Sequence, residues 1–168
     1  MDLLTYVQRA KRSPLHLWLL NAFFERMVPF NLPHKFRVTE IGEDHVKTLL
    51  PYRRKNLNHV KGLHACALAT LTEMTSGFLL AIKLDPKKFR LILRKLEIDY
   101  LYQGKMDAIC EFHLSSEWLQ SNIHNPLTRA DSVDIIAEVK IFDIKGNQLT
   151  SGKAYWQVKD WAKVRTKA

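Results

Sequence analysis

One acidic side chain lies inside the most apolar stretch of the chain. Residues 62–82 contain no proline, and only His64, Glu73 and several hydroxyl residues interrupt their apolar character. Burying a carboxylate is unfavourable, and burial raises the pKa of a carboxyl group unless hydrogen-bond donors reach it. Because a general acid or base near neutral pH needs such a raised pKa, Glu73 is a candidate catalytic residue. The alternative is a structural Glu73, hydrogen-bonded to a hydroxyl or a backbone donor.

The residues just before this stretch offer donors for a negative charge. The first N–H groups of a helix have no partners within the helix and lie at the positive end of its dipole. Gly62 allows a tight turn, and Ala65 and Cys66 are small enough for a carbonyl oxygen to approach their N–H groups. With Asn58 as a neighbouring amide, these residues are a candidate oxyanion site. Most helix starts are only capped, however, and a histidine such as His64 is more often structural than catalytic.

Two helices are needed to place these groups. The length and composition of residues 62–83 predict a central helix, buried because it is apolar almost all round. On it, Glu73 shares a face with Cys66 and Gly77, whose small size leaves room for a ligand or for close packing. An N-terminal helix is predicted over residues 14–28, after the start signal Ser13-Pro14. Its apolar stripe is Leu15, Trp18, Leu19, Ala22, Phe23 and Met27.

Alternating apolar residues predict about six strands. These strands are residues 35–41, 44–50, 92–102, 108–114, 133–144 and 148–158. Turns at Gly42-Glu43, Gln103-Gly104-Lys105 and Lys145-Gly146-Asn147 predict three hairpins, and residues 117–132 read as irregular with one helical turn near Trp118. The result is an α+β fold, an antiparallel sheet wrapped around one buried helix. The outer face and edges of the sheet would be covered by a dimer and, in part, by the N-terminal helix.

Length and composition predict a single domain, residues 1–168. The chain has 168 residues of which 46% are hydrophobic, enough for one core. Cys66 and Cys110 both lie in apolar runs, which predicts reduced core thiols, a cytoplasmic location and no metal site. The sequence shows no export signal and no unbroken run of about 20 apolar residues, so we expect no stable membrane insertion.

The charge balance predicts an anionic partner. There are 26 Lys and Arg against 17 Asp and Glu, a net charge of +9, which would attract nucleic acid, an acidic membrane or a phosphorylated cofactor. Nucleic acid is disfavoured, because Tyr100 and Tyr102 alternate with Glu97 and Asp99 rather than with basic residues. Residues 159–168 are predicted to form a short basic tail.

The spacing of the candidate residues resembles a known signature. Asn58, five residues, His64-Ala65-Cys66, six residues and Glu73 resemble the Asn…His-Gly-Gly…Asp pattern of hotdog-fold acyl-CoA thioesterases of the phenylacetate-thioesterase type. The N-terminal helix ahead of a hairpin, the Asn-rich loop and the later Ile98-Asp99-Tyr100…Gly104-Lys105 are similar to the DUF4442 family. The resemblance covers about residues 14–158.

This resemblance implies a hotdog fold and hydrolysis of an acyl-CoA or another acyl thioester, with no cofactor beyond the coenzyme A of the substrate. Glu73 would be the general base or nucleophile, the Ala65 N–H, within the His64 motif, would polarise the thioester carbonyl, and Asn58 would hold the water or the thioester. In the family the acid comes from the other subunit, which implies a homodimer or a dimer of dimers. The phosphates of coenzyme A would meet the basic residues Arg53, Arg54, Lys87, Lys88 and Arg90, which otherwise form a solvated surface.

The sequence departs from the family pattern at two places. His64-Ala65-Cys66 replaces His-Gly-Gly and adds two Cβ atoms beside the oxyanion site. Glu73 replaces Asp and moves the carboxylate by about one bond length, a scale of misplacement that affects catalysis strongly.

Two alternatives to hydrolysis stay open. His59 and Glu73, fourteen positions apart, resemble the His and Glu of hotdog dehydratases acting on 3-hydroxyacyl thioesters, although the proline-rich connection of that family is missing. The other alternative is a hotdog dimer that binds acyl ligands without catalysis.

Overall fold

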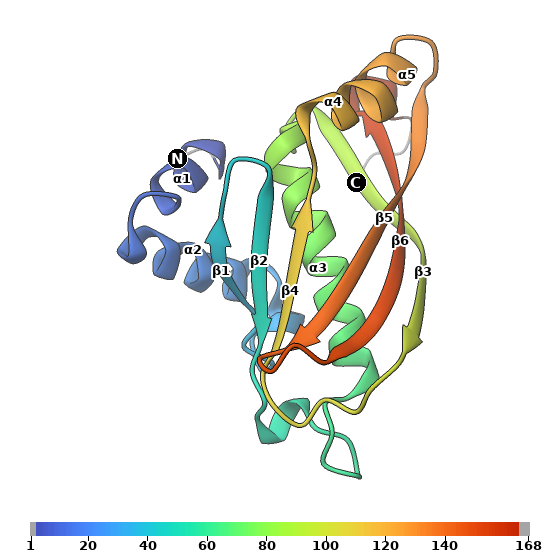
Figure 1. Ribbon diagram of the computed structural model, residues 1–168. Helices are drawn as coiled ribbons and strands as arrows, with labels where there is room; N and C mark the ends of the chain where they lie inside the picture. Colours follow the sequence, from blue (N-terminus) through green and yellow to red (C-terminus); the bar gives the residue numbers. More distant parts are fainter. Residues whose placement is uncertain (1–2, 165–168) are drawn as a thin grey trace.

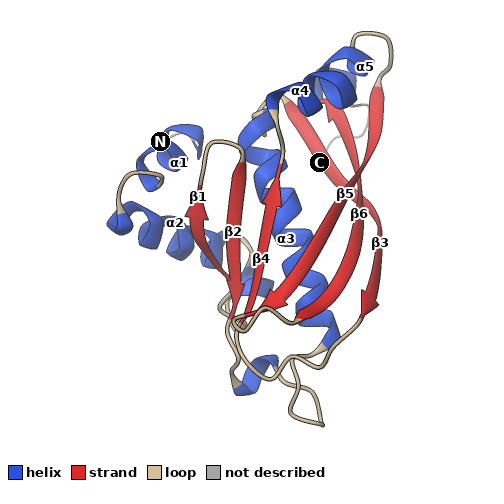
Figure 2. Ribbon diagram, viewed as in Figure 1, coloured by secondary structure: helices blue, strands red, loops and turns tan. Residues whose placement is uncertain are grey.

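The protein is one antiparallel sheet with a long helix along one face, as seen in a computed structural model that describes residues 3–164 (Figures 1 and 2). The six strands lie in the order β1-β2-β4-β5-β6-β3, and the central helix α3 runs across them. The predicted α+β arrangement, a sheet wrapped around one helix, is confirmed.

The strands are β1 (Arg37–Ile41), β2 (His45–Leu50), β3 (Phe89–Tyr100), β4 (Ala108–His113), β5 (Ser132–Asp143) and β6 (Gln148–Asp160). The α-helices are α1 (Leu3–Ala10), α2 (Pro14–Met27), α3 (Ala65–Leu84), α4 (Ser116–Leu119) and α5 (Asn125–Leu127). The shorter 3-10 or π turns are η1 (Pro29–Asn31), η2 (Arg54–Asn56), η3 (Gln120–His124) and η4 (Trp161–Lys163). Helix α1 is absent from the predictions, and residues 116–127, most of the segment predicted to be irregular, are helical.

Two of the three predicted hairpins are confirmed, β1–β2 and β5–β6, with Val38 opposite Thr48 in the first. The third is wrong: β3 pairs with β6, whereas β4 pairs with β2 and β5. Residues 101–107 cross past the start of α3, where the Leu63 N–H donates to the Gly104 carbonyl at 2.8 Å. Alternation identifies a strand but not its neighbour, and the crossing leaves β3 at the edge of the sheet.

Close approach of the sheet to α3 depends on small and hydroxyl residues. A Cβ at Gly152 of β6 would lie 3.1 Å from the Thr72 methyl carbon, and Oγ1 of Thr48 on β2 lies 2.6 Å from Oγ1 of Thr75. The length and apolar composition of α3 would also fit a membrane span. This is weak evidence, because half of that span is buried here and a soluble protein's core helix has the same properties.

Helix α2 closes one edge of the sheet. The Asn21 side chain donates to the Val38 carbonyl at 2.8 Å and accepts from the Val38 N–H at 2.7 Å, so it satisfies the backbone of edge strand β1. Phe24 packs edge-on against Phe78 of α3, with 5.0 Å between ring centroids. The expectation that this helix covers the outer face of the sheet is therefore wrong: it covers an edge and the flank of α3.

The outer face of the sheet is polar instead. Lys153 of β6 pairs with Glu138 of the neighbouring β5 at 3.7 Å, and Arg94 of β3 reaches past β6 to pair with Asp134 of β5 at 2.8 Å. Such a face can meet water without a cover.

The first part of the predicted basic tail belongs to the fold. Strand β6 continues to Asp160, and the Trp161 indole in η4 donates to the Pro86 carbonyl at 2.9 Å. The rest of the prediction, residues 165–168, lies outside the described residues.

Candidate functional site

The segment that leads into α3, residues 56–66, is here called the entrance segment. At its beginning Asn56 is fully buried, and its side-chain nitrogen donates to the carbonyls of His34 and Pro51 at 2.9 and 2.8 Å. Its side-chain oxygen lies 2.9 Å from Nδ1 of His34, and its carbonyl accepts from the His64 N–H at 2.8 Å. Asn56, in η2, thus joins the loop at His34, Pro51 just after β2 and the start of α3.

Asn58 holds the next turn of the entrance segment. Its side-chain oxygen accepts from the N–H groups of Val60 and Gly62, at 3.1 and 2.9 Å, and its own N–H donates to the Gly62 carbonyl at 2.8 Å. This turn is the reason that α3 begins at Ala65 and not at the predicted residue 62. The Asn58 amide oxygen is therefore committed to structure, and only its NH₂ group can serve a ligand.

His64 caps α3. Its Nδ1 accepts from the Cys66 N–H at 3.1 Å, which requires the neutral ring to carry its proton on Nε2. The Cys66 N–H, one of the two donors predicted for an oxyanion, is thus occupied. Among the described residues the exposed Ala65 N–H has no partner, so it is the donor that remains at this helix start. A hollow of about 270 Å³ lies beside it, lined in part by His64, Cys66 and Thr70.

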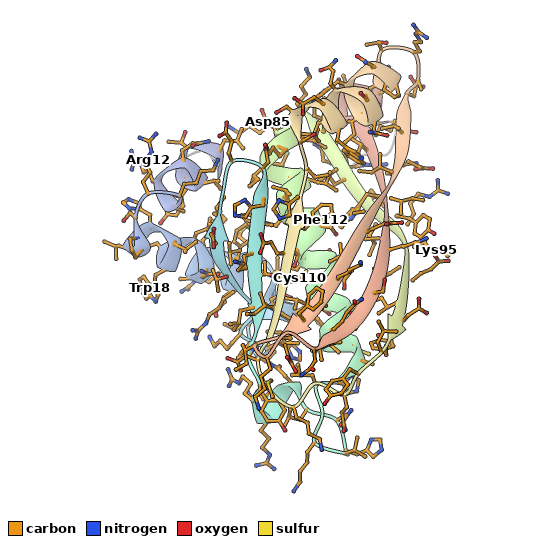
Figure 3. The ribbon with its side chains drawn as sticks, viewed as in Figure 1. Arg12, Trp18, Asp85, Lys95, Cys110 and Phe112 are labelled. Carbon is orange, nitrogen blue, oxygen red and sulfur yellow. The ribbon has the colours of Figure 1, made fainter. Side chains whose placement is uncertain are left out.

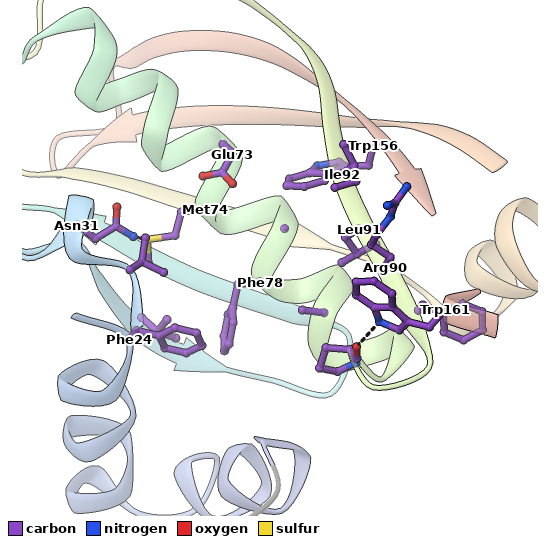
Figure 4. Close-up of a pocket in the computed structure, with 16 residues that line it drawn as sticks. Phe24, Asn31, Glu73, Met74, Phe78, Arg90, Leu91, Ile92, Trp156 and Trp161 are labelled. Carbon is purple, nitrogen blue, oxygen red and sulfur yellow. Dashed lines mark hydrogen bonds between the residues drawn. The ribbon is translucent and has the colours of Figure 1, made fainter. Parts of the chain in front are cut away.

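Glu73 lies in a second and larger cavity of about 660 Å³, here called the Glu73 cavity (Figure 4). Phe24 and Asn31 form one flank, and Leu91 and Ile92 of β3 form the other. The remaining lining residues are Val28, Val38, Met74, Gly77, Phe78, Ala81, Pro86, Phe89, Arg90, Trp156 and Trp161. Apart from Glu73, Asn31 and Arg90, the walls are apolar or aromatic.

The Glu73 carboxylate has no hydrogen bond or ion pair within residues 3–164. Burial alone raises the pKa of this carboxyl above its ordinary value. The structural alternative, in which a hydroxyl or backbone donor satisfies Glu73, is therefore not what the fold shows. The carboxyl can accept or donate a proton inside an apolar cavity, as a general base or acid must.

Gly77, one turn after Glu73, is used for close packing. A Cβ at this position would lie 2.8 Å from two atoms of the Trp156 ring. The indole N–H of Trp156 donates to Oγ of Ser76 at 3.1 Å, which fixes the ring as a wall of the cavity. The small residues on this helical face thus have separate uses, because Gly77 admits Trp156 while Cys66 lines the entrance hollow.

The five basic residues predicted to meet coenzyme A are divided by the length of α3. Arg53 and Arg54 lie beside the entrance segment. Lys87 and Lys88 lie beyond the other end of α3, just after Asp85, and Figure 3 labels Asp85. Twenty residues of α-helix span about 30 Å. The two groups in one chain therefore lie too far apart to hold the same phosphate.

Arg90 is the member of that set that lines the Glu73 cavity. Its guanidinium lies over the Trp161 ring, 5.9 Å from the centroid, and its Nε is buried with no hydrogen-bond partner in the described chain. Two polar lining residues, Glu73 and Arg90, thus carry a group without a hydrogen-bond partner in the part of the chain that the structure describes: the Glu73 carboxylate and the Arg90 Nε.

The structure does not bring all the predicted residues together within one chain. Ala65 and Glu73 are eight residues apart on α3, about 12 Å along its axis. His59 is exposed in the turn before the helix, and no hydrogen bond or ion pair joins it to Glu73 within the described residues. Other cavity residues were missed by the sequence analysis: Phe24, Asn31, Trp156 and Trp161 come from four separate elements, and no spacing in the sequence connects them.

The two cysteines differ. Both are free, Cys110 is buried, and burial raises the pKa of its thiol to about 12. Cys66 is exposed, so the prediction of two core thiols is wrong for this residue. It lies in the first turn of α3, where His64, Ala65 and Cys66 are all exposed, and an apolar run does not show where a helix leaves the core.

The comparison with protein families agrees with the fold. The sequence model of DUF4442, described as a domain of unknown function, matches residues 17–165. No protein of curated function matches the chain.

Solved structures with the same fold include several described as thioesterases. A protein of unknown function from Pseudomonas aeruginosa, described as a probable thioesterase, has a TM-score of 0.76 at 21% identity, over 92% of this chain and 95% of its own. A thioesterase from Staphylococcus aureus has a TM-score of 0.64 at 15% identity, over 79% and 99%. One from Haemophilus influenzae has a TM-score of 0.64 at 9% identity, over 82% and 87%. At these identities the likeness establishes the hotdog fold.

Proposed function

Because the chain belongs to the DUF4442 family and has the hotdog fold of structures described as thioesterases, we propose that it hydrolyses acyl thioesters, with an acyl-CoA as substrate. The observation that carries the proposal is the Glu73 carboxyl, which has no partner among the described residues and lies in a mostly apolar cavity of about 660 Å³. A buried acid with a raised pKa beside space for an apolar chain is what hydrolysis of an acyl ester needs.

The proposed active site needs two chains. A reacting thioester carbonyl must lie within about 3 Å of both an N–H donor and the base or its water. Because Ala65 and Glu73 of one chain are roughly 12 Å apart along α3, they cannot contact the same carbonyl. Strand β3 is an edge strand that borders the Glu73 cavity. Pairing of two β3 edges across a two-fold axis would run the two α3 helices antiparallel, so that the start of one approaches the middle of the other.

In the proposed reaction, the Glu73 carboxylate takes a proton from a water molecule as that water attacks the thioester carbon. The carbonyl oxygen becomes an oxyanion, which accepts from the Ala65 N–H of the other chain, while the Asn58 NH₂ group orients the thioester. The C–S bond then breaks, and the protonated Glu73 returns its proton to the departing thiolate. The products are a carboxylic acid and a free thiol.

The remaining parts of the substrate have matching surroundings. The acyl chain would lie against the apolar walls of the Glu73 cavity, and the thiol arm would pass the hollow beside the entrance segment. Arg53 and Arg54, at that end, would meet the phosphates of coenzyme A. The free thiols of Cys66 and Cys110 support the proposal of a cytoplasmic location.

A thiol-release screen over short, long and aromatic acyl-CoA esters tests the activity. We expect hydrolysis of at least one ester and a loss of about 100-fold or more in kcat for Glu73→Gln, because the amide cannot accept the proton from water. His59→Ala should leave hydrolysis unchanged, whereas a dehydratase would lose activity. If every ester is inert while acyl-CoA binds, the protein is a binding protein.

Mixed dimers test whether the site is shared. Glu73→Gln is combined with Asn58→Asp, which keeps the oxygen that holds the turn but removes the NH₂ donor. Each variant alone should be inactive. Random mixing should restore about one quarter of the sites, since half of each mixed dimer is intact. No restoration would show that the active site lies within one chain.

A further inference from the structure

Helix α2 has two apolar faces, and only one of them is buried. Leu20 is fully buried, and Leu17 and Phe24 pack against the core. The opposite face is the apolar stripe that the periodicity of the sequence identifies, and it faces solvent. Its exposed residues are Leu15 (63%), Trp18 (64%), Leu19 (37%), Phe23 (49%) and Met27 (62%).

This exposed stripe continues past the end of the helix. Val28, Phe30 and Leu32 are 41%, 61% and 46% exposed. Single exposed apolar residues are ordinary in folded proteins, but a contiguous stripe that includes a tryptophan and two phenylalanines indicates a surface that binds something apolar. We call these eight residues the α2 stripe.

Basic residues outnumber acidic ones in the described segment that carries the α2 stripe. Residues 3–41 contain six basic and two acidic residues, a net charge of +4. Of the two acids, Glu25 pairs with Lys35 at 2.7 Å, and Glu40 pairs with His45 and Lys47. Arg12 and Arg26 are both exposed, and Figure 3 shows Arg12 projecting outward at the same end of the molecule as Trp18.

Arg26 lies on the same helical face as the α2 stripe, because it is three positions after Phe23 and seven after Leu19. A second copy of the chain is therefore a poor occupant: a two-fold axis would set the arginines of one stripe against those of the other. A surface with an apolar interior and negative charges at its edge would match both the apolar side chains of the α2 stripe and the arginines beside it.

We propose that the α2 stripe docks on an anionic membrane surface. Aromatic and leucine side chains enter the boundary between headgroups and acyl chains, and Arg12 and Arg26 meet the lipid phosphates. The helix, about 21 Å long, lies parallel to the bilayer and does not cross it.

The docked surface would adjoin the Glu73 cavity. Val28 belongs to the α2 stripe and also lines the cavity, so the stripe reaches the cavity rim. On this point the inference rests on the proposed function: acyl thioesters whose long chains partition into the membrane would reach Glu73 from the side of α2.

Flotation with vesicles tests the docking independently of hydrolysis. Purified protein is mixed with phosphatidylcholine vesicles containing about 30 mol % phosphatidylglycerol or none. We expect binding to the anionic vesicles, at least tenfold weaker binding without phosphatidylglycerol, and release by salt. The variant Leu15→Gln/Trp18→Gln/Phe23→Gln should lose binding about 100-fold, and Arg12→Gln/Arg26→Gln should lose it about 25-fold.

A matched control replaces exposed apolar residues elsewhere, Ile136→Gln/Ile144→Gln, and should bind as the wild type does. Circular dichroism checks that every variant is folded. Equal binding by the control and stripe variants would overturn the proposal. The proposal would also be overturned if the wild type did not bind vesicles and the stripe variant sedimented as a monomer where the wild type is a dimer. The occupant of the stripe would then be a second copy of the chain. Vesicle binding without hydrolysis would leave the docking intact and reject the proposed activity.

Discussion

The entrance segment and the Glu73 cavity border the same helix but treat polar groups in opposite ways. In the entrance segment, the side chains of Asn56, Asn58 and His64 form hydrogen bonds with backbone groups. The Ala65 N–H has no hydrogen-bond partner among the described residues. In the cavity, which is mostly apolar, neither the Glu73 carboxylate nor the buried Nε of Arg90 has a hydrogen-bond partner within residues 3–164. The proposed reaction needs both the Ala65 N–H donor and the Glu73 carboxyl. Because they lie at separate places on α3, one chain alone does not form the proposed active site.

The largest effect on stability should come from breaking the entrance segment. Asn56→Ala removes three hydrogen bonds of a buried side chain and leaves the half-buried His34 and Pro51 without these donors to their carbonyls. We expect the free energy of unfolding to fall by about 2–4 kcal/mol in urea denaturation. Asn122→Ala, which removes an exposed bond to the Trp118 carbonyl, should change it by less than about 0.5 kcal/mol. Equal losses would show that the segment is not an organised unit.

Filling the space at Gly77 should disturb the cavity wall less. Gly77→Ala places a methyl group against Trp156, which must move, and we expect a loss of about 1–3 kcal/mol. In a Trp156→Phe background the same change should be milder, because the contacting ring atoms are gone. A double-mutant cycle measures the difference, and strict additivity would contradict the contact.

The smallest effect tests the cavity's unsatisfied acid through pH. Burial raises the pKa of Glu73, so the unfolded chain loses this proton first as the pH rises above the ordinary value of 4.5. The free energy of unfolding therefore falls as the pH rises towards the folded pKa, and it stays lowered at higher pH. Glu73→Gln removes that loss of stability. The variant should therefore be more stable than the wild type near neutral pH, with the difference shrinking as the pH falls below 4.5.

Thermal unfolding across this pH range measures the effect. Glu43→Gln, at an exposed position, is the matched control for the loss of one negative charge. A Glu73→Gln variant less stable than the wild type near neutral pH would show that the carboxylate has a stabilising partner.

Local pattern predicted the elements well and their neighbours less well. The length of residues 62–83 was sufficient for α3, and alternation with turn residues was sufficient for the hairpins β1–β2 and β5–β6. The β3–β4 hairpin failed because a short turn-like sequence, Gln103-Gly104-Lys105, serves here as part of a crossing. The stripe of α2 was recognised as one apolar face, but the face that packs on the core is another, anchored by Leu20 and Asn21.

By itself the sequence determined that a buried helix carries a lone acid, that a polar turn precedes it, and that strands surround it, because these features depend on neighbours along the chain. Only the tertiary structure decided that Glu73 faces a cavity, that Arg90 shares it, that Cys66 is exposed and that the α2 stripe meets solvent. The physical reason is that burial is a property of surroundings: Phe24, Asn31, Trp156 and Trp161 meet around Glu73 through pairings and crossings that no local spacing encodes.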